Sequence, residues 1–314
     1  MNKVGIIGGA GFIGSHVTKT FLNEGFEVKV STQDISIKNK YQHLMDLEHS
    51  DKLHICELDI TNKTLLKDFV KDCDIVIHSG TPFQLNIKDP DTEIFTPTIE
   101  GTKNFLEIIK KTPAVKKAVL IASVAAWNTN FPLPVEGKSN NDPFDESEPH
   151  FIDNQSHPYS KAKFMANKTV DEFIQNNPGL NVIITSVSPV LVMGQPLSNR
   201  DDSTSSNLQF LIKHNIAPDA FTQMLFEQDI EFAIVNVKDV AQAIFKAATI
   251  PGLHGKNFLL SSESYSISDI HLMLNNKPPK NPPKVIYQNT LAEQKLGIPF
   301  QSVETTLKEY TQSD

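Results

Sequence analysis

Short apolar runs alternate with amphipathic segments through the first two thirds of the chain. The apolar runs predict strands and the 3.6-residue periodicity predicts helices. The expected strands are Val4–Ile7, Glu27–Ser31, Asp74–His78, Val115–Ala122 and Leu180–Val187, and the expected helices are Phe12–Asn23, Thr64–Lys71, Ile94–Lys111 and Tyr159–Gln175. Uninterrupted apolar strands are typical of a sheet covered on both faces. The pattern therefore predicts an α/β fold with a doubly wound parallel sheet.

The regular pattern breaks at three places further along the chain. Residues 128–157 are rich in Asn, Pro, Asp, Glu and Ser, and a stretch this long without structure is usually functional or mobile. Residues 199–207 are polar and typical of a loop, and the proline-rich residues 277–283 predict a connector. We expect a main domain at residues 1–188 and a smaller α/β lobe at residues 189–314, from which about 229–262 returns to the main domain.

Composition and charge exclude several classes of protein. The 314 residues carry a formal net charge of −8, which argues against a nucleic-acid binder that relies on phosphate contacts. Because the longest apolar runs have only the length of strands, no membrane span is expected, and no signal peptide precedes the first strand. Cys56 and Cys73 are too few for a disulfide scaffold, which favours the cytoplasm. The histidines show no metal-ligand spacing, so no metal is expected.

A glycine-rich turn follows the first predicted strand. Its sequence is Gly8-Gly9-Ala10-Gly11-Phe12-Ile13-Gly14, and it leads into an apolar helix. The glycines allow a tight turn and a close approach of backbone N–H groups to a pyrophosphate, and the helix N-terminus favours the anion. A glycine pattern alone is weak evidence, but this one lies in the first strand-turn-helix of the chain. We therefore expect a Rossmann-type domain that binds a dinucleotide at Gly8, Gly11, Phe12, Ile13 and Gly14.

The end of the second strand should decide between NAD and NADP. A carboxylate there holds the ribose hydroxyls of NAD, whereas an arginine meets the 2′-phosphate of NADP. This chain has Thr32 and Gln33 at that place. Lys38 and Lys40 follow, either as phosphate contacts or as solvated surface lysines. The balance favours NADP, with NAD as the alternative.

Asp59 follows a further expected strand, the third of the chain, which lies between Glu27–Ser31 and the helix expected at Thr64–Lys71. Two interpretations of its carboxylate stay open. It either accepts a hydrogen bond from the amino group of adenine or caps the N-terminus of the helix expected at Thr64–Lys71.

Tyr159 and Lys163 are four residues apart and share one face of a predicted helix. An ammonium beside a phenol lowers the pKa of the tyrosine, which can then act as a general acid or base. Ser123 stands at the C-terminal end of a predicted strand, where ligands of open α/β sheets bind, and its hydroxyl can hold a substrate carbonyl oxygen. A Tyr-x-x-x-Lys pair also arises in ordinary amphipathic helices, but together with Ser123 it predicts a catalytic site.

These motifs together resemble the extended short-chain dehydrogenase/reductases. The segments that carry the resemblance are Gly8–Gly14, Asp59-Ile60, Ser123, Tyr159 with Lys163, and Ser188–Gly194. Further segments look like the dihydroflavonol-4-reductase, cinnamoyl-CoA reductase and methylglyoxal reductase branch, namely His78–Phe83, Lys88–Pro90, Pro97–Thr102 and Asn236–Ala241. The resemblance covers residue 3 to about residue 262.

The resemblance implies an NADP-dependent carbonyl reductase. In that family the tyrosine gives a proton to the carbonyl oxygen, the lysine binds the nicotinamide ribose and the serine holds the oxygen. These roles fall on Tyr159, Lys163 and Ser123. The branch usually has arginine at the place of Gln33. The resemblance adds to the cofactor-binding set Ile60, Ser79, Gly80, Thr81, Pro189 and Val192.

Four apolar side chains belong to segments that are expected at the nicotinamide end of the cleft, namely Phe83, Val124, Trp127 and Met193. An apolar wall suits a small aldehyde or ketone of modest polarity. Trp127 and Met193 are equally expected in the hydrophobic core. The sequence thus predicts a cytoplasmic NAD(P)H-dependent reductase of a small carbonyl compound, present as a monomer or homodimer.

Two other functions stay open. A nucleotide-sugar epimerase or dehydratase uses the same serine, tyrosine and lysine, but it needs an acid near Thr32 and basic residues in the C-terminal lobe, where Arg200 is the only arginine. A dinucleotide-sensing regulator without turnover has no need of the three residues together. Both alternatives are therefore less favoured than the reductase.

Overall fold

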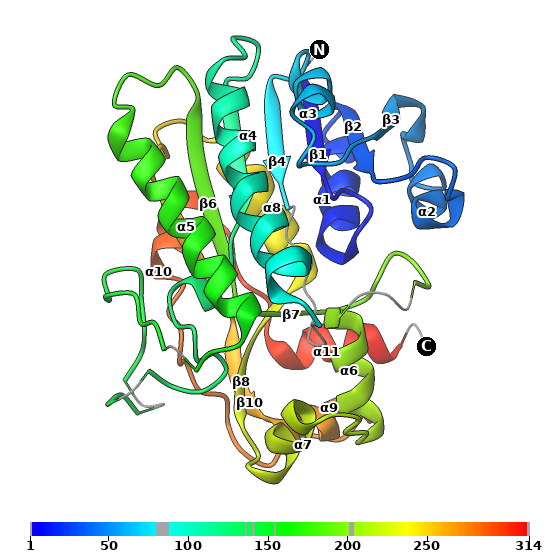
Figure 1. Ribbon diagram of the computed structural model, residues 1–314. Helices are drawn as coiled ribbons and strands as arrows, with labels where there is room; N and C mark the ends of the chain where they lie inside the picture. Colours follow the sequence, from blue (N-terminus) through cyan, green and yellow to red (C-terminus); the bar gives the residue numbers. More distant parts are fainter. Residues whose placement is uncertain are drawn as a thin grey trace.

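Seven parallel strands form the main sheet of the computed structural model, which describes residues 2–79, 88–135, 137–139, 142–153, 155–200 and 204–312 (Figure 1). In spatial order the strands are β3 (Leu53–Glu57), β2 (Glu27–Thr32), β1 (Lys3–Ile7), β4 (Ile75–His78), β5 (Lys117–Ile121), β6 (Ile183–Pro189) and β9 (Asn257–Leu260). The order changes direction between β1 and β4, and in open parallel sheets ligands bind at such a point, beyond the carboxyl ends of the strands.

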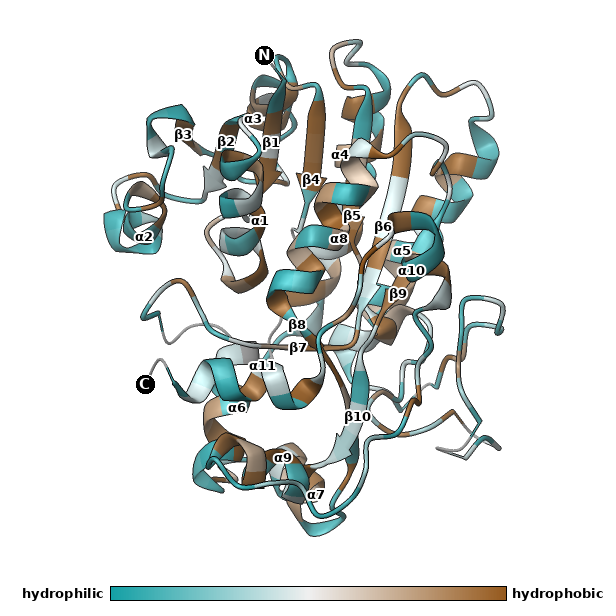
Figure 2. Ribbon diagram, turned by 180° about the vertical axis from the view of Figure 1, so that it is seen from behind, coloured by the Kyte–Doolittle hydropathy of each residue, from teal (hydrophilic) through white to brown (hydrophobic). Residues whose placement is uncertain are grey.

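Helices cover both faces of this sheet (Figures 1 and 2). One face carries α3 (Lys63–Val70), α4 (Gly101–Lys110) and α5 (Pro158–Asn176), and the other carries α1 (Phe12–Asn23), α8 (Val237–Thr249) and α10 (Thr290–Leu296). Along β5, Val119 and Ile121 join the hydrophobic cluster under α1 and α8, whereas Ala118 and Leu120 join the cluster under α4. Side chains alternate along a strand, so apolar residues on both faces need a helix layer on each. The predicted doubly wound fold is confirmed.

A smaller lobe follows the main sheet. Its sheet has the order β10 (Glu263–Ser266), β8 (Glu231–Asn236) and β7 (Leu191–Met193), with β7 parallel and β10 antiparallel to β8. The helices of the lobe are α6 (Thr204–His214), α7 (Ala220–Glu227), α9 (Ile267–Leu274) and α11 (Val303–Thr311). They enclose a third hydrophobic cluster, which includes Leu208, Phe232 and Ile270. Within residues 229–262, β8 belongs to the lobe sheet while α8 and β9 lie with the main sheet, and the functional division at residue 188 stays a prediction.

Two segments differ from their sequence predictions. The helix expected at Ile94–Lys111 begins as a π-helical segment, Asp91–Glu100, which runs into α4. Pro97 lies inside this segment, and because proline lacks an N–H group it interrupts the regular i→i−4 ladder. The prediction of a loop at residues 199–207 is wrong for residues 204–207, because α6 begins at Thr204. Burial of apolar side chains such as Leu208 in the lobe core outweighs the low helix propensity of this polar stretch.

The described positions within the irregular residues 128–157 contain turns and isolated bridges, such as Asn128 with Phe151 and Phe144 with Tyr287. Asn128 is buried, and its side-chain amide donates hydrogen bonds to the Leu133 carbonyl and the Tyr287 hydroxyl, each at 2.9 Å. The Thr129 N–H donates to the Phe151 carbonyl at 3.1 Å. The segment is therefore tied to the connector near Tyr287, and the proline-rich residues 277–283 contain neither helix nor strand, as predicted.

Three of the remaining short elements connect β2 to β3, and the fourth follows β5. They are η1 (Lys38–Lys40), α2 (Gln42–Met45), η2 (Ser50–Lys52) and η4 (Val124–Ala126). Both cysteines are free thiols. Among the helices in the described ranges, none combines the length and apolar character needed to cross a membrane.

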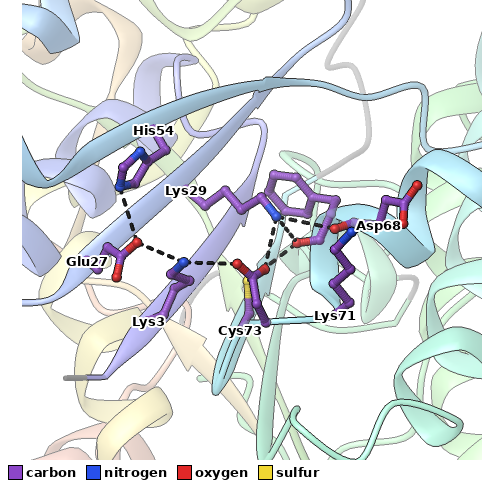
Figure 3. Close-up of polar contacts among 9 residues, drawn as sticks. Lys3, Glu27, Lys29, His54, Asp68, Lys71 and Cys73 are labelled. Atoms are coloured by element: carbon purple, nitrogen blue, oxygen red, sulfur yellow. Dashed lines mark hydrogen bonds and ion pairs between the residues drawn. The ribbon is translucent and has the colours of Figure 1, made fainter.

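A chain of ion pairs joins the N-terminal ends of the central strands (Figure 3). Lys3 Nζ lies 2.7 Å from the Glu27 carboxylate and 2.9 Å from that of Asp72. Lys29 Nζ lies 3.0 Å from Asp72, and His54 Nε2 lies 3.2 Å from Glu27. Burial alone would raise the pKa of Asp72, but hydrogen bonds from both lysines outweigh it and hold this pKa at about 2.

Replacing Asp72 with asparagine should lower the free energy of unfolding at pH 7 by about 1 kcal/mol, since the network is half exposed and partly screened. A lowered folded-state pKa contributes stability above the unfolded pKa, and this contribution is lost as the pH falls from about 4 towards 2. Urea unfolding of wild type and Asp72→Asn at pH 7 and pH 3 should show a difference that shrinks at pH 3. Asp68→Asn, which removes a more exposed pair with Lys71, is the control. An equal difference at both pH values would contradict this role for Asp72.

Candidate active site

The turn between β1 and α1 packs so closely that side chains do not fit at two of its glycines. Gly8 has φ +77°, and a Cβ on Gly14 would lie 2.1 Å from the Gly8 carbonyl oxygen. The Gly11 N–H donates to the same carbonyl at 3.1 Å. Gly11 is also the N-cap of α1, and no side chain caps this helix. Its first N–H groups are therefore suited to hold an anion, so the turn fits the pyrophosphate of a dinucleotide.

A cavity of about 330 Å³ begins at this turn and continues between the main sheet and the lobe. Its first part is lined by the glycine turn, Ser79 and Arg200. Its centre is lined by the segment after β5, the start of α5 and residues 189–192. The lobe end is lined by the apolar residues Phe131, Pro132, Leu208, Phe221 and Phe232.

Ser123, Tyr159 and Lys163 meet at the centre of this cavity and form what we call the Ser-Tyr-Lys cluster. The side chains of Ser123 and Tyr159 are hydrogen-bonded to each other. The Ser123 Oγ also accepts a hydrogen bond from the Ala125 N–H at 3.1 Å. Lys163 Nζ lies 5.9 Å from the centre of the Tyr159 ring and donates to the Ile121 carbonyl at 3.0 Å. The cluster is thus assembled from the end of β5 and one face of α5.

The N-terminus of α5 fixes which side chains face the end of β5. His157 is the N-cap, and its Nδ1 accepts a hydrogen bond from the Tyr159 N–H at 3.2 Å. Pro158 occupies the first helical position, where its missing N–H costs nothing. Ala162 and Val170 are buried on the face of the helix that packs against the protein. These contacts set the rotation of α5, so Tyr159 and Lys163 both face the cavity.

Burial shifts the pKa of both ionisable groups in the cluster. It raises the pKa of Tyr159 to about 12, against the opposing effect of the hydrogen bond with Ser123. It lowers the pKa of Lys163 to about 8. The expected lowering of the tyrosine pKa is not found, because burial disfavours the phenolate and outweighs the hydrogen bond with Ser123. Tyr159 is therefore a phenol at neutral pH, as a proton donor must be.

Many of the residues singled out from the sequence line this cavity. They are Gly8, Gly11, Phe12, Ile13, Gly14, Ser79, Ser123, Tyr159, Lys163, Pro189 and Val192. Gly80, Thr81 and Phe83 lie outside the described residues. In the described ranges, no group of three or more His, Cys, Asp or Glu side chains is placed to hold a metal ion.

The residues expected around the adenosine half are not part of the cavity lining. Thr32 is buried at the end of β2, Gln33 is exposed, and Lys38 and Lys40 are the ends of η1. Ile60 is half-buried after β3. Their roles in cofactor binding stay predictions.

One of the two interpretations of Asp59 is wrong. Its carboxylate accepts hydrogen bonds from the Thr61 N–H at 2.9 Å and the Thr61 hydroxyl at 2.7 Å. Asn62 is the N-cap of α3, because its side-chain oxygen accepts the N–H groups of Thr64 and Leu65. Contact of the exposed Asp59 with adenine stays a prediction.

Val124, Trp127 and Met193 do not line the cavity, in contrast to the substrate wall expected from the sequence. All three are buried in hydrophobic clusters. The Trp127 Nε1 donates to the Ser188 hydroxyl at 3.2 Å, which turns the indole towards the core. For Trp127 and Met193 the structure supports the alternative of core packing.

The apolar wall comes instead from residues that the sequence analysis missed. Phe131 and Pro132 belong to the irregular residues 128–157, and Phe221 and Phe232 belong to the lobe. The rings of Phe131 and Phe232 meet edge to face with centres 5.4 Å apart. One sequence signal could have identified Phe131, namely the presence of an aromatic residue within a polar, proline-rich stretch. His157 and Arg200 also line the cavity and were not predicted there.

Comparison with known proteins identifies the family to which the chain belongs. The NAD dependent epimerase/dehydratase family matches residues 4–260. The cinnamoyl-CoA reductase CAD2 of Medicago truncatula is 27% identical over an alignment that covers 99% of this chain and 95% of that protein. The match confirms the resemblance to the extended short-chain dehydrogenase/reductases.

Solved structures share the fold along the whole chain. Yeast methylglyoxal/isovaleraldehyde reductase Gre2, solved with NADPH, is 23% identical and has a TM-score of 0.80, with 99% of this chain and 97% of that chain covered. The UDP-glucose 4-epimerase of Thermotoga maritima, solved with UDP-glucose, is 18% identical and has a TM-score of 0.72, with the same shares of the two chains covered. Since reductases and an epimerase share this fold, the fold alone does not identify the reaction.

Replacing Gly14 with alanine should disrupt the glycine turn, because the new methyl group would meet the Gly8 carbonyl. We expect a loss of about 1–3 kcal/mol in the free energy of unfolding, as for other overpacked sites. Gly179→Ala is the matched control, since a Cβ there meets no atom within 4 Å and should change stability by less than about 0.5 kcal/mol. Urea unfolding measures both variants. Equal stability of Gly14→Ala and Gly179→Ala would contradict the close packing.

Proposed function

Because the chain belongs to the NAD dependent epimerase/dehydratase family, we propose that it is an NAD(P)H-dependent reductase that transfers hydride to an aldehyde or ketone. One observation carries this proposal. The hydroxyl, phenol and ammonium of the Ser-Tyr-Lys cluster meet at the centre of a cavity that begins at a turn suited to a pyrophosphate. Relatives named as reductases of carbonyl compounds support it.

NADPH is the cofactor we propose, with NADH as the alternative. The N–H groups at the start of α1 hold its pyrophosphate, and Lys163 binds the nicotinamide ribose. When bound, the reduced nicotinamide supplies the hydride. The further contacts we propose along the cofactor are Thr32, Gln33, Lys38, Lys40, Asp59, Ile60, Ser79, Gly80, Thr81, Pro189 and Val192.

The protein's own part in the reaction is to hold and protonate the carbonyl oxygen. The Ser123 hydroxyl donates a hydrogen bond to this oxygen, and Tyr159 gives it the phenolic proton as hydride reaches the carbonyl carbon. The products are an alcohol and a phenolate. The Lys163 ammonium stabilises the phenolate until a proton from solvent restores the tyrosine. The high pKa of Tyr159 keeps its proton in place until negative charge develops on the substrate.

The substrate we propose is an uncharged aldehyde or ketone of modest polarity. The lobe end of the cavity is lined by three phenylalanines, Phe131, Phe221 and Phe232, together with Leu208 and Pro132. An apolar pocket with a few polar groups at one end binds an apolar molecule and fixes its orientation through those groups. Here the polar groups belong to Ser123 and Tyr159, which leaves the carbonyl facing the cluster.

This lining favours a reductase over a nucleotide-sugar epimerase or dehydratase. A nucleotide sugar carries a diphosphate, which needs cations or N–H groups in the substrate part of the site. The described residues at the lobe end of the cavity are apolar, and the guanidinium of Arg200 lies at the glycine turn instead. A sensor without turnover would not require the Ser-Tyr-Lys cluster.

The cellular setting we propose follows from simple features of the chain. The binding partner of the protein is a small carbonyl compound, and the protein works as a monomer or homodimer. The formal net charge of −8 disfavours nucleic acid. Cys56 and Cys73 as free thiols support the reducing cytoplasm.

Tyr159→Phe removes the proton donor and should lower the turnover number about 10²- to 10⁴-fold, the usual contribution of a general acid. Binding of NADPH should change by less than about threefold, since the ring remains. Oxidation of NADPH in the presence of apolar aldehydes measures turnover, and fluorescence titration measures binding. Tyr310→Phe, at a buried lobe tyrosine outside the cavity lining, is the control. Full turnover in Tyr159→Phe would refute the mechanism.

The dependence of kcat on pH should report the ionisation of the Lys163 side chain. Its pKa of about 8 means that it is charged at neutral pH and loses its charge as the pH rises through about 8. We expect kcat for reduction to be constant near pH 6–7 and to fall above about pH 8, because the neutral amine no longer stabilises the phenolate. Rates at saturating NADPH from pH 6 to pH 10 test this. A rate that stays constant to pH 10 would contradict it.

A further inference from the structure

Arg200 is the only arginine of the chain, and its side chain crosses from the segment after β7 to the nucleotide end of the cavity. The Arg200 Nη1 donates hydrogen bonds to the Ala10 carbonyl at 3.1 Å and to the Lys40 carbonyl at 2.8 Å. Ala10 belongs to the glycine turn, and Lys40 ends η1, which follows β2. In folds of this kind the adenosine ribose lies between the glycine turn and the end of β2. One guanidinium thus joins the glycine turn to η1, the short helix that follows β2 in the chain.

The backbone that carries Arg200 is held in place by contacts at its beginning. The Gln195 carbonyl hydrogen-bonds with the Nε2 of His16 on α1 at 2.9 Å. The Gly194 N–H donates to the side-chain oxygen of the buried Gln209 at 2.9 Å. The segment is therefore anchored both to α1 and to α6. These contacts fix the start of the segment, and Arg200 itself is half-buried.

The surroundings of Arg200 favour an anion. The N-terminus of α1 lies in the same part of the cavity and carries partial positive charge. His43, whose Nε2 lies 3.1 Å from the Ser15 hydroxyl, has a pKa lowered by burial and by the charge of Arg200. The Asp34 carboxylate accepts hydrogen bonds from the N–H and hydroxyl of Ser36, so it is engaged in its own turn.

The residue directly at the end of β2 is not a cation, and Lys38 and Lys40 follow it only in η1. Folds of this kind accommodate the 2′-phosphate of NADP with an arginine near that strand end. The residue there is Gln33, which is uncharged and exposed. A guanidinium is a planar fork that binds two phosphate oxygens at once, and charged oxygens are stronger acceptors than backbone carbonyls.

We propose that Arg200 binds the 2′-phosphate of NADPH and thereby sets the preference of this chain for NADPH over NADH. On binding, its guanidinium exchanges the carbonyl oxygens of Ala10 and Lys40 for phosphate oxygens. The cation that distinguishes the two cofactors thus comes from the segment after β7 and not from β2. This inference rests on the proposed function, because it requires that the cavity binds a nicotinamide dinucleotide.

Direct binding measurements test the role of Arg200 without turnover. Calorimetric titrations of wild type and Arg200→Gln should use NADPH, NADH, adenosine 2′,5′-bisphosphate and 5′-AMP. We expect Arg200→Gln to weaken NADPH and the bisphosphate about 10- to 100-fold, the loss of one or two charge-assisted hydrogen bonds. NADH and 5′-AMP should change less than about threefold. Lys277→Gln, which removes one exposed positive charge outside the cavity lining, is the control and should change none of the four.

Two further variants separate recognition of the phosphate from an effect on folding. Arg200→Lys keeps the charge but loses the fork, so NADPH should weaken by an intermediate factor while NADH stays unchanged. Adding Gln33→Arg to Arg200→Gln returns a cation to the end of β2 and should recover most of the NADPH affinity. Thermal unfolding of each variant shows whether it is folded. If Arg200→Gln is not folded, the comparison of Arg200→Lys with wild type provides the test.

The outcomes distinguish this inference from the proposed function. Equal weakening of NADPH and NADH, or no weakening of either, overturns the role of Arg200 and leaves the reductase proposal standing. Tighter binding of NADH than of NADPH by wild type also overturns the role of Arg200 and leaves the reductase proposal standing. Failure of wild type to bind either dinucleotide overturns both proposals.

Discussion

The close packing of α1 against the turn that follows β1 is the constraint on which the site depends. Gly14 leaves no room for a side chain beside the Gly8 carbonyl, so α1 packs directly against the turn that follows the central strand. On the same face, α8 packs against α1. The next strands, β4, β5 and β6, pair in parallel register, which brings Ser79, Ser123 and Pro189 to the same edge of the sheet. The polar groups of the cavity are thus placed by the sheet.

The two halves of the cavity have different chemical characters because they come from different parts of the fold. The sheet edge and the start of α5 supply hydroxyls, a phenol and an ammonium, whereas the lobe and residues 128–157 supply aromatic rings. Burial of the cluster keeps Tyr159 protonated and makes Lys163 a weaker base than an exposed lysine. Under the proposed function, a change in the lobe lining would alter which carbonyl compound fits, whereas the groups that handle the proton would stay the same.

The sequence predicted those parts of the molecule that local patterns determine. The bounds of α1 follow from the glycine turn and the apolar periodicity, and the pairing of Tyr159 with Lys163 follows from their spacing on a helix. Ser123 was found because it ends an apolar run. Parts that depend on long-range contacts were not predicted. Burial in the core and exposure to a cavity give the same apolar signal, so Trp127 and Met193 were not distinguishable from wall residues.

The contacts of Arg200 were likewise not predictable, because nothing in its local sequence indicates that its side chain reaches Ala10 and Lys40. The direction of the shift in the pKa of Tyr159 was also beyond the sequence. It depends on how deeply the phenol is buried, and the residues that bury it come from distant parts of the chain.

The most direct test of the account is hydride transfer from NADPH labelled with deuterium at the transferable position, with an apolar aldehyde or ketone as acceptor. Mass spectrometry of the product should show one deuterium in each alcohol formed and one NADPH oxidised for each alcohol. A protein that retains NAD tightly, interconverts a nucleotide sugar and gives no labelled alcohol with any carbonyl compound would contradict the account.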